Sequence, residues 1–294
     1  MLVRRGKKKM KILAPLRGVT IRCFRRTFSR QIANSGFTEA ITPFISAMNG
    51  VDPLRDRELQ RLGAAEEALA ITPQFIGKDP AALRFCLKRI KSAGYRTADL
   101  NCGCPFPMVR NKGRGSGLLR TPDIFEAMVR AGCEEMGEGN FSVKARLGVD
   151  SPDELARLMP ILNRYPLRFL TVHARTARQM YTGKPDIQAF EEIRAAAKMP
   201  VVYNGDYNAD APQTDIPDIM VGRPFVASLG KLSDSRELLL NYIDQSAAEL
   251  HGQRPVLGRI KELVSYWQDI PYWKNRWPLV KTATSLAELT LAIR

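Results

Sequence analysis

The sequence contains little histidine or cysteine, and it lacks a long apolar segment. No run of about 18 apolar residues occurs, which excludes a membrane-spanning helix and a membrane partner. The basic N-terminus is not followed by an apolar segment, so no secretory signal is expected. The five cysteines are an odd number in a chain that is large enough to fold without disulfides. These features favour a cytoplasmic protein with free thiols.

Patterns that bind metals or dinucleotides are also missing. Cys102 and Cys104 are separated by one residue, which is too short a spacing for the usual Cys-x-x-Cys motif. No second cysteine pair or histidine cluster lies nearby, so we expect no metal site. Gly113 and Gly115 match part of a dinucleotide fingerprint, but the third glycine is misplaced and no suitable acidic strand end follows. The sequence therefore excludes a Rossmann-type nucleotide site.

Acidic residues are scarce relative to basic ones. The chain has 45 Lys and Arg against 30 Asp and Glu, a formal net charge of +15. The first carboxylate is Glu39, and the residues before it include eleven cations. A field of this sign attracts polyanions and accelerates their capture. Charge by itself fits either a nucleic-acid partner or a solubility surplus with a solvated basic tail.

Short apolar, β-rich segments alternate with amphipathic segments along most of the chain. Apolar residues recur at helical spacing between the strands, and the segment 122–130 begins with proline as helices often do. The predicted helices are 80–91, 122–130, 153–163 and 186–197. The predicted strands are Ile12–Leu16, Phe37–Phe44, Ile71–Gly77, Thr97–Cys104, Phe141–Leu147, Phe169–His173, Val201–Asn204 and Asp218–Val221.

Eight strands that alternate with helices predict an α/β fold, a (β/α)8 TIM barrel, which typically needs about 250 residues. An open doubly wound sheet is the alternative, because the order of elements does not show whether the sheet closes. From about residue 238 no strand-like segment occurs, and 258–267 and 285–293 read as helices. We therefore expect a barrel domain at 1–237 and a small all-helical domain at 238–294.

Nearly every predicted strand ends in a polar residue or a glycine. Because the carboxyl ends of barrel strands form the active face, these residues are expected to gather at one end of the barrel. The strand-end residues are Ala14, Pro15, Leu16, Gln74, Asn101, Cys104, Lys144, Arg146, His173, Arg175, Asn204, Gly205, Asp206, Gly222 and Arg223.

Cys104 differs from the other four cysteines because it lies in a Gly-Cys-Pro turn beyond a strand. A thiol in this position could donate a proton. The other cysteines are expected to be inert, small apolar residues. The nearby segment 113–119 is rich in glycine, which permits close approach to a ligand.

Lys144 and His173 are unusual residues for buried strands. Lys144 is either a surface residue or faces an anion or electron-rich ring inside the barrel. His173 is either a satisfied core histidine or a functional one. Gly205 and Gly222 follow the seventh and eighth strands, where such barrels often hold a phosphate. A phosphate site, an amide, a cation and a thiol together fit flavin mononucleotide, FMN.

These motifs resemble the signatures of the tRNA-dihydrouridine synthase family, in the same order along the chain. The tail segment 258–267 is also similar to the helical domain of the bacterial subfamily C, which acts at uridine 16 of the D-loop. The matching barrel segments are Ala14–Thr20, Gln74–Gly77, Asn101–Pro105, Gly115–Leu119, Lys144–Gly148, His173–Thr176, Asn204–Asp206 and Gly222–Arg223.

The resemblance implies that the barrel binds FMN and the tail binds tRNA. FMN would be reduced by NADPH and would pass a hydride to C6 of a flipped-out uridine, and Cys104 would protonate C5. Asn101 and Arg146 would contact the substrate. A monomer is expected. The residues that would hold FMN are Ala14, Pro15, Leu16, Gln74, Lys144, His173, Asn204, Gly205, Asp206, Gly222 and Arg223.

Two departures from the family pattern affect the phosphate site. The segment 207–217 is short and contains prolines, which predicts a shortened or missing seventh helix. Pro224 stands where the family more often has glycine and removes one N–H donor. Two alternatives therefore stay open. One is an FMN-binding, RNA-binding protein without turnover, and the other is a small-molecule FMN oxidoreductase of the dihydroorotate dehydrogenase type.

Overall fold

The computed structural model describes residues 9–56, 59, 69–207 and 216–294. Ten parallel β segments form one sheet, in the order β3-β5-β6-β7-β8-β9-β10-β1-β2-β4. The segments are β1 Lys11–Leu13, β2 Glu39–Ile41, β3 Ile45–Ser46, β4 Ala70–Thr72, β5 Gln74–Ile76, β6 Ala98–Cys102, β7 Phe141–Gly148, β8 Leu170–Thr176, β9 Val201–Asn204 and β10 Ile219–Val221.

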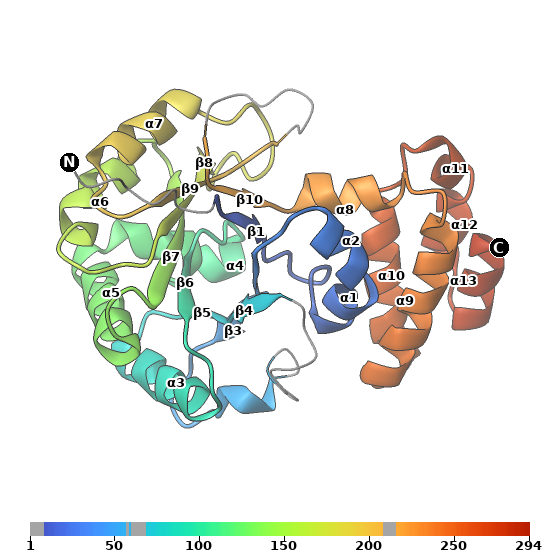
Figure 1. Cartoon of the computed structure of the whole chain (residues 1–294), viewed down its shortest axis with the longest axis horizontal. Helices are drawn as coiled ribbons and strands as arrows, with labels where there is room; N and C mark the ends of the chain where they lie inside the picture. Colours follow the sequence, from blue (N-terminus) through green and yellow to red (C-terminus); the bar gives the residue numbers. More distant parts are fainter. Residues whose placement is uncertain (1–8, 57–58, 60–68, 208–215) are drawn as a thin grey trace.

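The sheet closes into a barrel, and two of its strands are interrupted. Pro43 lies between β2 and β3, and Pro73 lies between β4 and β5, where a residue without an N–H breaks the ladder. The segment β2 pairs with β4 at one end of the sheet order, and β3 pairs with β5 at the other end. Because β2 and β3 belong to one interrupted strand, and β4 and β5 to the next, these two pairings join the ends of the sheet. The prediction of a (β/α)8 barrel with eight strands is confirmed (Figure 1).

Two strands end at least two residues earlier than their sequence patterns predict. The first stops at Leu13 rather than Leu16, because Pro15 cannot donate to a ladder. The fourth predicted strand stops at Cys102, because the next two N–H groups donate to the Asn101 side chain instead of to a neighbouring strand. In both places the early end frees the chain to form a turn at the mouth of the barrel.

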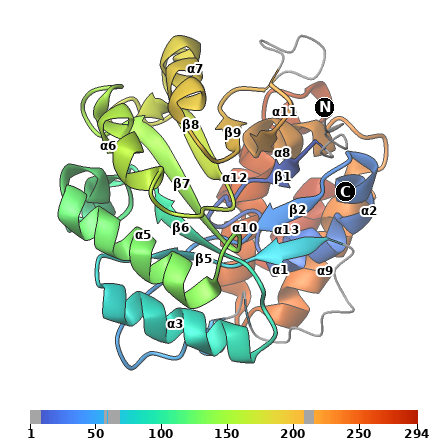
Figure 2. The same ribbon diagram turned by 60° about the vertical axis from the view of Figure 1, so that its left-hand side comes forward.

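Helices follow the strands around the outside of the barrel (Figure 2). The helix predicted at 122–130 continues to Met136 and stops at Gly137, whose φ of 86° suits glycine. The barrel helices are α1 Arg22–Thr27, α2 Ser29–Asn34, α3 Pro80–Ser92, α5 Pro122–Met136, α6 Glu154–Leu162, α7 Ile187–Ala196 and α8 Arg223–Leu229. Shorter helical turns lie in the loops: Pro53–Arg55, α4 Pro107–Arg110 and Gly115–Arg120.

The chain after the barrel is helical throughout its described length. Its helices are α9 Ser235–Glu249, α10 Gln253–Ser265, α11 Pro271–Lys274, α12 Trp277–Thr282 and α13 Leu286–Ile293. They lie beside α1 and α8 (Figure 1). Trp267 and Trp273 fasten them there by donating to the carbonyls of Val226 at 2.8 Å and Gly230 at 3.2 Å. None of the helices in the described ranges is long and apolar enough to cross a membrane.

The interior of the barrel has two chemically different sides. Successive side chains of a strand point to opposite faces, and the outward residues of β6, β7 and β8 pack apolar atoms against the helices. The inward residues of β5 to β8 form a polar arc: Gln74, Asp99, Asn101, Ser142, Lys144, Arg146, Thr171, His173 and Arg175. The opposite side is an apolar arc: Ile12, Ala14, Ile41, Phe169, Val202 and Met220.

Candidate active site

The residues expected to form the site lie on the strands or directly beyond their carboxyl ends, and Gln74 lies where an interrupted strand resumes. Ala14 to Leu16 follow β1, Lys144 and Arg146 lie on β7, and Arg223 opens α8. The remaining positions are Gln74 on β5, Asn101 on β6, Cys104 in the following turn, His173 on β8, Asn204 at the end of β9, Gly205 and Asp206 beyond it, and Gly222 beyond β10.

Asn101 is turned toward the protein itself. Its Oδ1 accepts hydrogen bonds from the backbone N–H groups of Gly103 at 3.1 Å and Cys104 at 2.9 Å. Its Nδ2 donates to Oε1 of Gln74 at 2.7 Å. The side chain expected to contact substrate therefore shapes the turn that carries Cys104.

Gln74 is held from its other end by a buried carboxylate. Its Nε2 donates to Asp99 at 2.7 Å, and Ser142 donates to the other oxygen of Asp99 at 2.6 Å. Burial raises the pKa of Asp99 to about 6, and the two hydrogen bonds limit the rise. Asp99 was not among the expected site residues. The alternation of β6 could have found it, because Asp99 shares a face with Asn101.

Cys104 lies almost fully buried in a turn that a glycine completes. Its carbonyl accepts hydrogen bonds from the backbone and the hydroxyl of Ser116, at 3.1 and 2.9 Å. A Cβ on Gly115 would lie 2.8 Å from the Cβ of Cys104, so only glycine fits.

The thiol of Cys104 is suited to hold a proton. Burial raises the pKa of Cys104, and the Phe106 N–H and the charges of Arg17 and Arg146 oppose this rise without cancelling it. The thiol is therefore protonated at neutral pH. A proton donor requires this state.

Lys144 is a partly buried cation next to an oriented amide. Its Nζ donates to Oδ1 of Asn204 at 2.9 Å, while Nδ2 of Asn204 donates to the carbonyl of Met220 at 2.9 Å. Burial, and second the charge of Arg146, lower the pKa of Lys144 to about 8. The group still carries its proton at neutral pH, so it lies inside the barrel as a cation and is not a surface lysine.

The side chains of Arg146 and His173 are both buried. Arg146 is 2% exposed and donates to the carbonyls of Gly103 and Thr176, both at 2.9 Å. It joins the Cys104 turn to the end of β8. Burial, followed by the charge of Arg146, lowers the pKa of His173 well below its usual value. The imidazole is therefore neutral at pH 7, and its ring centroid lies 6.2 Å from that of Tyr181.

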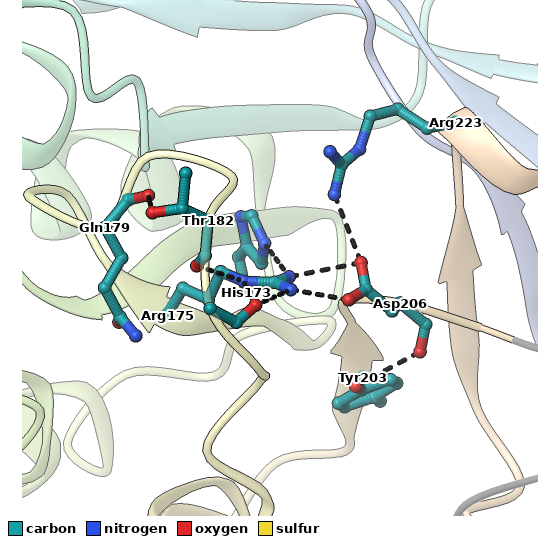
Figure 3. Close-up of polar contacts among 8 residues, drawn as sticks. His173, Arg175, Gln179, Thr182, Tyr203, Asp206 and Arg223 are labelled. Carbon is teal, nitrogen blue, oxygen red and sulfur yellow. Dashed lines mark hydrogen bonds and ion pairs between the residues drawn. The ribbon is translucent and has the colours of Figure 1, made fainter. Parts of the chain in front are cut away.

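Asp206 joins two arginines beyond β9 (Figure 3). It pairs with Arg175 at 2.5 Å and with Arg223 at 3.2 Å. Arg175 is buried and also donates to the Gly183 carbonyl at 2.7 Å, which ties the loop after β8 to the loop after β9. The guanidinium of Arg223 lies 4.7 Å from the ring centroid of Tyr181.

The loops after β9 and β10 leave no space for side chains at their glycines. A Cβ on Gly222 would lie 3.0 Å from the Cβ of Ala14, and one on Gly205 would lie 2.4 Å from the hydroxyl of Tyr203. Arg223 follows Gly222 directly, and Pro224 lies in the first turn of α8. The expected loss of a helix within 207–217 falls mostly on residues 208–215, which lie outside the described residues.

Sequence reasoning assigned no role to Arg175, Asp99 or Tyr181. Arg175 was expected at the active face as a strand-end residue, and it is the next inward residue after His173 on β8. Tyr181 has no such signal, because it lies in a loop and reaches Arg146 and Arg223 only through the fold. Among the residues that the structure describes, no group of three side chains is suited to a metal ion.

A closed parallel barrel with its polar residues at the strand ends defines the class of TIM barrels that carry a site on this face. Within that class, the model of the dihydrouridine synthase (Dus) family matches residues 12–224, and the chain belongs to this family.

Several curated proteins are similar to the chain. A tRNA-dihydrouridine synthase B from Pseudomonas aeruginosa is 30% identical, over 72% of this chain and 64% of that protein. A probable tRNA-dihydrouridine synthase from Rickettsia bellii is 29% identical, over 87% of this chain and 79% of that protein. A tRNA-dihydrouridine(16) synthase from Shigella flexneri is 29% identical, over 66% and 63%. The chain thus spans just under two thirds of the Pseudomonas and Shigella proteins.

Solved structures resemble the barrel at low identity. The crystal structure of TcOYE with pHBA has a TM-score of 0.54 at 11% identity and covers 83% of this chain and 97% of that one. Morphinone reductase has a TM-score of 0.53 at 15% identity and covers 74% and 83%. These likenesses concern the fold alone.

Proposed function

We propose that the protein is an FMN-dependent tRNA-dihydrouridine synthase that reduces a D-loop uridine to 5,6-dihydrouridine. The observation that carries the proposal is the Cys104 turn. A thiol kept protonated by burial lies at the mouth of a Dus-family barrel, close to the charges of Lys144 and Arg146. A proton donor beside cations suits a reaction in which an electron-rich pyrimidine takes up a proton.

The polar arc and the loops beyond it fit a flavin by the chemistry of their donors. Lys144 and the amide of Asn204 offer a cation and hydrogen bonds to the electron-accepting edge of a flavin ring, where they would stabilise a negative charge. Gln74 and the neutral His173 lie in the same arc. Ala14, Pro15 and Leu16 offer an apolar surface beside Gly222.

The phosphate would lie near the loops after β9 and β10. Gly205, Asp206, Gly222 and Arg223 surround this position, and Arg223 supplies the charge that a phosphate requires. Asp206 now pairs with Arg223, so a phosphate would take over part of that contact. The chemistry that FMN supplies when bound is hydride transfer, from NADPH to C6 of the uracil.

The residues of this chain would then position the base and move one proton. Cys104 would give its thiol proton to C5 of the uracil. Arg146, which donates to the carbonyl of Gly103 in the Cys104 turn, would face the base. Asn101 would contribute the second N–H of its side-chain amide, since the first donates to Gln74. The uridine must leave its stack first, because stacking hides C5 and C6.

The partner is proposed to be tRNA, held mainly through phosphate contacts by a chain of net charge +15. The helices of 238–294 would form the tRNA-binding domain, the barrel of 1–237 would form the catalytic domain, and the protein would act as a monomer. The tail motif at 258–267 favours position 16. The curated relatives support the family but not the resemblance to subfamily C: the Pseudomonas relative is named synthase B, and the Shigella relative is named for position 16.

The test uses purified protein and tRNA from a strain without dihydrouridine. The protein is expected to be yellow, to bleach with NADPH without oxygen, and to regain colour when tRNA is added. Mass spectrometry should then find dihydrouridine, and reverse-transcription mapping should locate it at position 16. Colour without reoxidation by tRNA would indicate a small-molecule oxidoreductase. Flavin and tRNA binding without reduction of either would indicate the protein without turnover, and a colourless protein would reject the proposal.

A further inference from the structure

A chain of hydrogen bonds with a fixed direction runs from the buried carboxylate of Asp99 to the turn of Cys104. The backbone N–H groups of Gly103 and Cys104 can only donate, so Oδ1 of Asn101 must face them. The Nδ2 of Asn101 then points at Gln74, and the oxygen of Gln74 must receive it at 2.7 Å.

The other end of the chain imposes the same direction. With its oxygen facing Asn101, Gln74 points its Nε2 at residue 99 and needs an acceptor there. Asp99 is fully buried and supplies that acceptor at 2.7 Å, while its other oxygen receives Ser142. An acceptor at this end and two backbone donors at the other leave one arrangement in which every group is satisfied.

We propose that Asp99 is a positioning residue: its side-chain acceptor orients the amides of Gln74 and Asn101 and so holds the turn that presents Cys104. The inference deepens the proposed function and rests on it only in making Cys104 the proton donor. Asp99 itself touches neither the substrate nor the flavin in this scheme.

The charges that face Asp99 offer a competing role as a counter-ion. Lys144 on β7 attracts its negative charge, and Glu39 on β2 repels it. Glu39 is itself paired with Arg168 at 2.6 Å, and the Cys102 thiol also lies within reach of the charge of Asp99. The experiment must therefore separate an acceptor from a negative charge.

Gln74→Glu tests the direction of the chain. The introduced carboxylate faces Asp99, and two carboxylates at hydrogen-bond distance cannot both ionise without repulsion, so the pair has a raised pKa. Below that pKa the pair holds a proton and the chain is satisfied, whereas above it the chain breaks. The double variant Gln74→Glu, Asp99→Asn moves the negative charge from position 99 to position 74. The amide N–H of the new asparagine then donates to the new carboxylate at every pH.

The measurement is the rate at which iodoacetamide alkylates Cys104, followed by peptide mass spectrometry and compared with the wild type at the same pH. We expect Gln74→Glu to react about tenfold faster at pH 8, since a broken buried hydrogen bond loosens the turn, and to approach the wild type at pH 5. The double variant should match the wild type at both values. A single variant like the wild type at pH 8, or a double variant as fast as the single, overturns the proposal.

Asp99→Asn alone separates the acceptor from the charge. The new asparagine can keep its oxygen toward Gln74 and donate to Ser142, whose hydroxyl can then donate to the carbonyl of Ala98. Its alkylation rate should therefore stay within about twofold of the wild type. A loss of protection as large as in Gln74→Glu would assign the role to the charge and reject the acceptor role.

Thr171→Val is the matched control, because Thr171 is buried in the same arc and its hydroxyl has no partner among the described residues. It should leave the alkylation rate unchanged. Alkylation needs neither flavin nor tRNA, so the result stands even if the wild type forms no dihydrouridine, and that failure would count against the proposed function alone. In active protein, Gln74→Glu should lower kcat at pH 8 and leave KM for tRNA unchanged.

Discussion

The polar and apolar arcs both line the barrel interior, and only Lys144 among their residues is partly exposed, but the two arcs have different roles. The apolar arc packs six residues, on or next to β1, β2, β8, β9 and β10, against one another, and these contacts need no particular direction. In the polar arc a buried group without a partner costs about 1–3 kcal/mol, so its hydrogen bonds must be matched one by one. One side of the barrel therefore supplies stability, while the other supplies orientation.

The largest expected effect concerns the thiol at the top of the polar arc. Cys104→Ala should lower dihydrouridine formation by about 10²- to 10⁴-fold, the range that general acids contribute. Cys102→Ala is the control, because Cys102 is buried on the outward face of β6. The product is measured by nucleoside mass spectrometry. If Cys104→Ala kept the wild-type rate, another residue would be the proton donor.

The apolar arc should respond in stability rather than in orientation. Phe169→Ala removes a fully buried ring and should lower the free energy of unfolding by about 3–5 kcal/mol. Urea denaturation of the folded chain measures this. The alkylation rate of Cys104 should change little at low denaturant. A variant as stable as the wild type would show that this arc is not the packed centre of the barrel.

Lys144 should make stability depend on pH in the polar arc. Its pKa falls from 10.5 in the unfolded chain to about 8 in the fold, so the unfolded chain binds more protons between these values. The penalty for burying the charge is full below about pH 8 and is relieved as the pH rises. Relative to Lys144→Met, the wild type should gain up to about 3 kcal/mol between pH 8 and 10.5. A constant difference would mean that Lys144 is solvated.

The smallest expected effect is at the unpartnered hydroxyl of the polar arc. Thr171→Val exchanges this hydroxyl for a methyl group of similar size. Since no hydrogen bond to the described residues is lost, thermal denaturation should show no change or a gain within about 1 kcal/mol. A larger loss would reveal a partner for Thr171 and would weaken the contrast between the arcs.

The succession of strands and helices along the chain, and the apolar faces of the helices, could be predicted because they depend on local periodicity. Val143 and Ala145 alternate with Lys144 in the sequence, and this alternation places the lysine inside the barrel. The interruptions at Pro43 and Pro73 were missed, although both residues are visible in the sequence. A continuous apolar run was read as a continuous strand, and the missing N–H groups were not counted.

The site was predicted as a set of positions rather than as a set of contacts. Asn101 was expected to face a substrate, but its amide faces the backbone of Gly103 and Cys104. Arg175 was noted as a strand-end residue without a role, and its pairing with Asp206 depends on a residue 31 positions away. Such pairings have no local signal, because many acceptors in the sequence have the same chemistry.

The sequence by itself determined which side chains point into the barrel and which ends of the strands carry them, because covalent geometry alternates side chains along every strand. Only the tertiary structure decided which of these groups meet. Lys144 and Asn204 lie 60 residues apart and become partners at 2.9 Å because β7 and β9 both pair with β8, one on each side. The direction of each hydrogen bond, the burial of the Cys104 thiol and its raised pKa likewise depend on which groups the fold brings together.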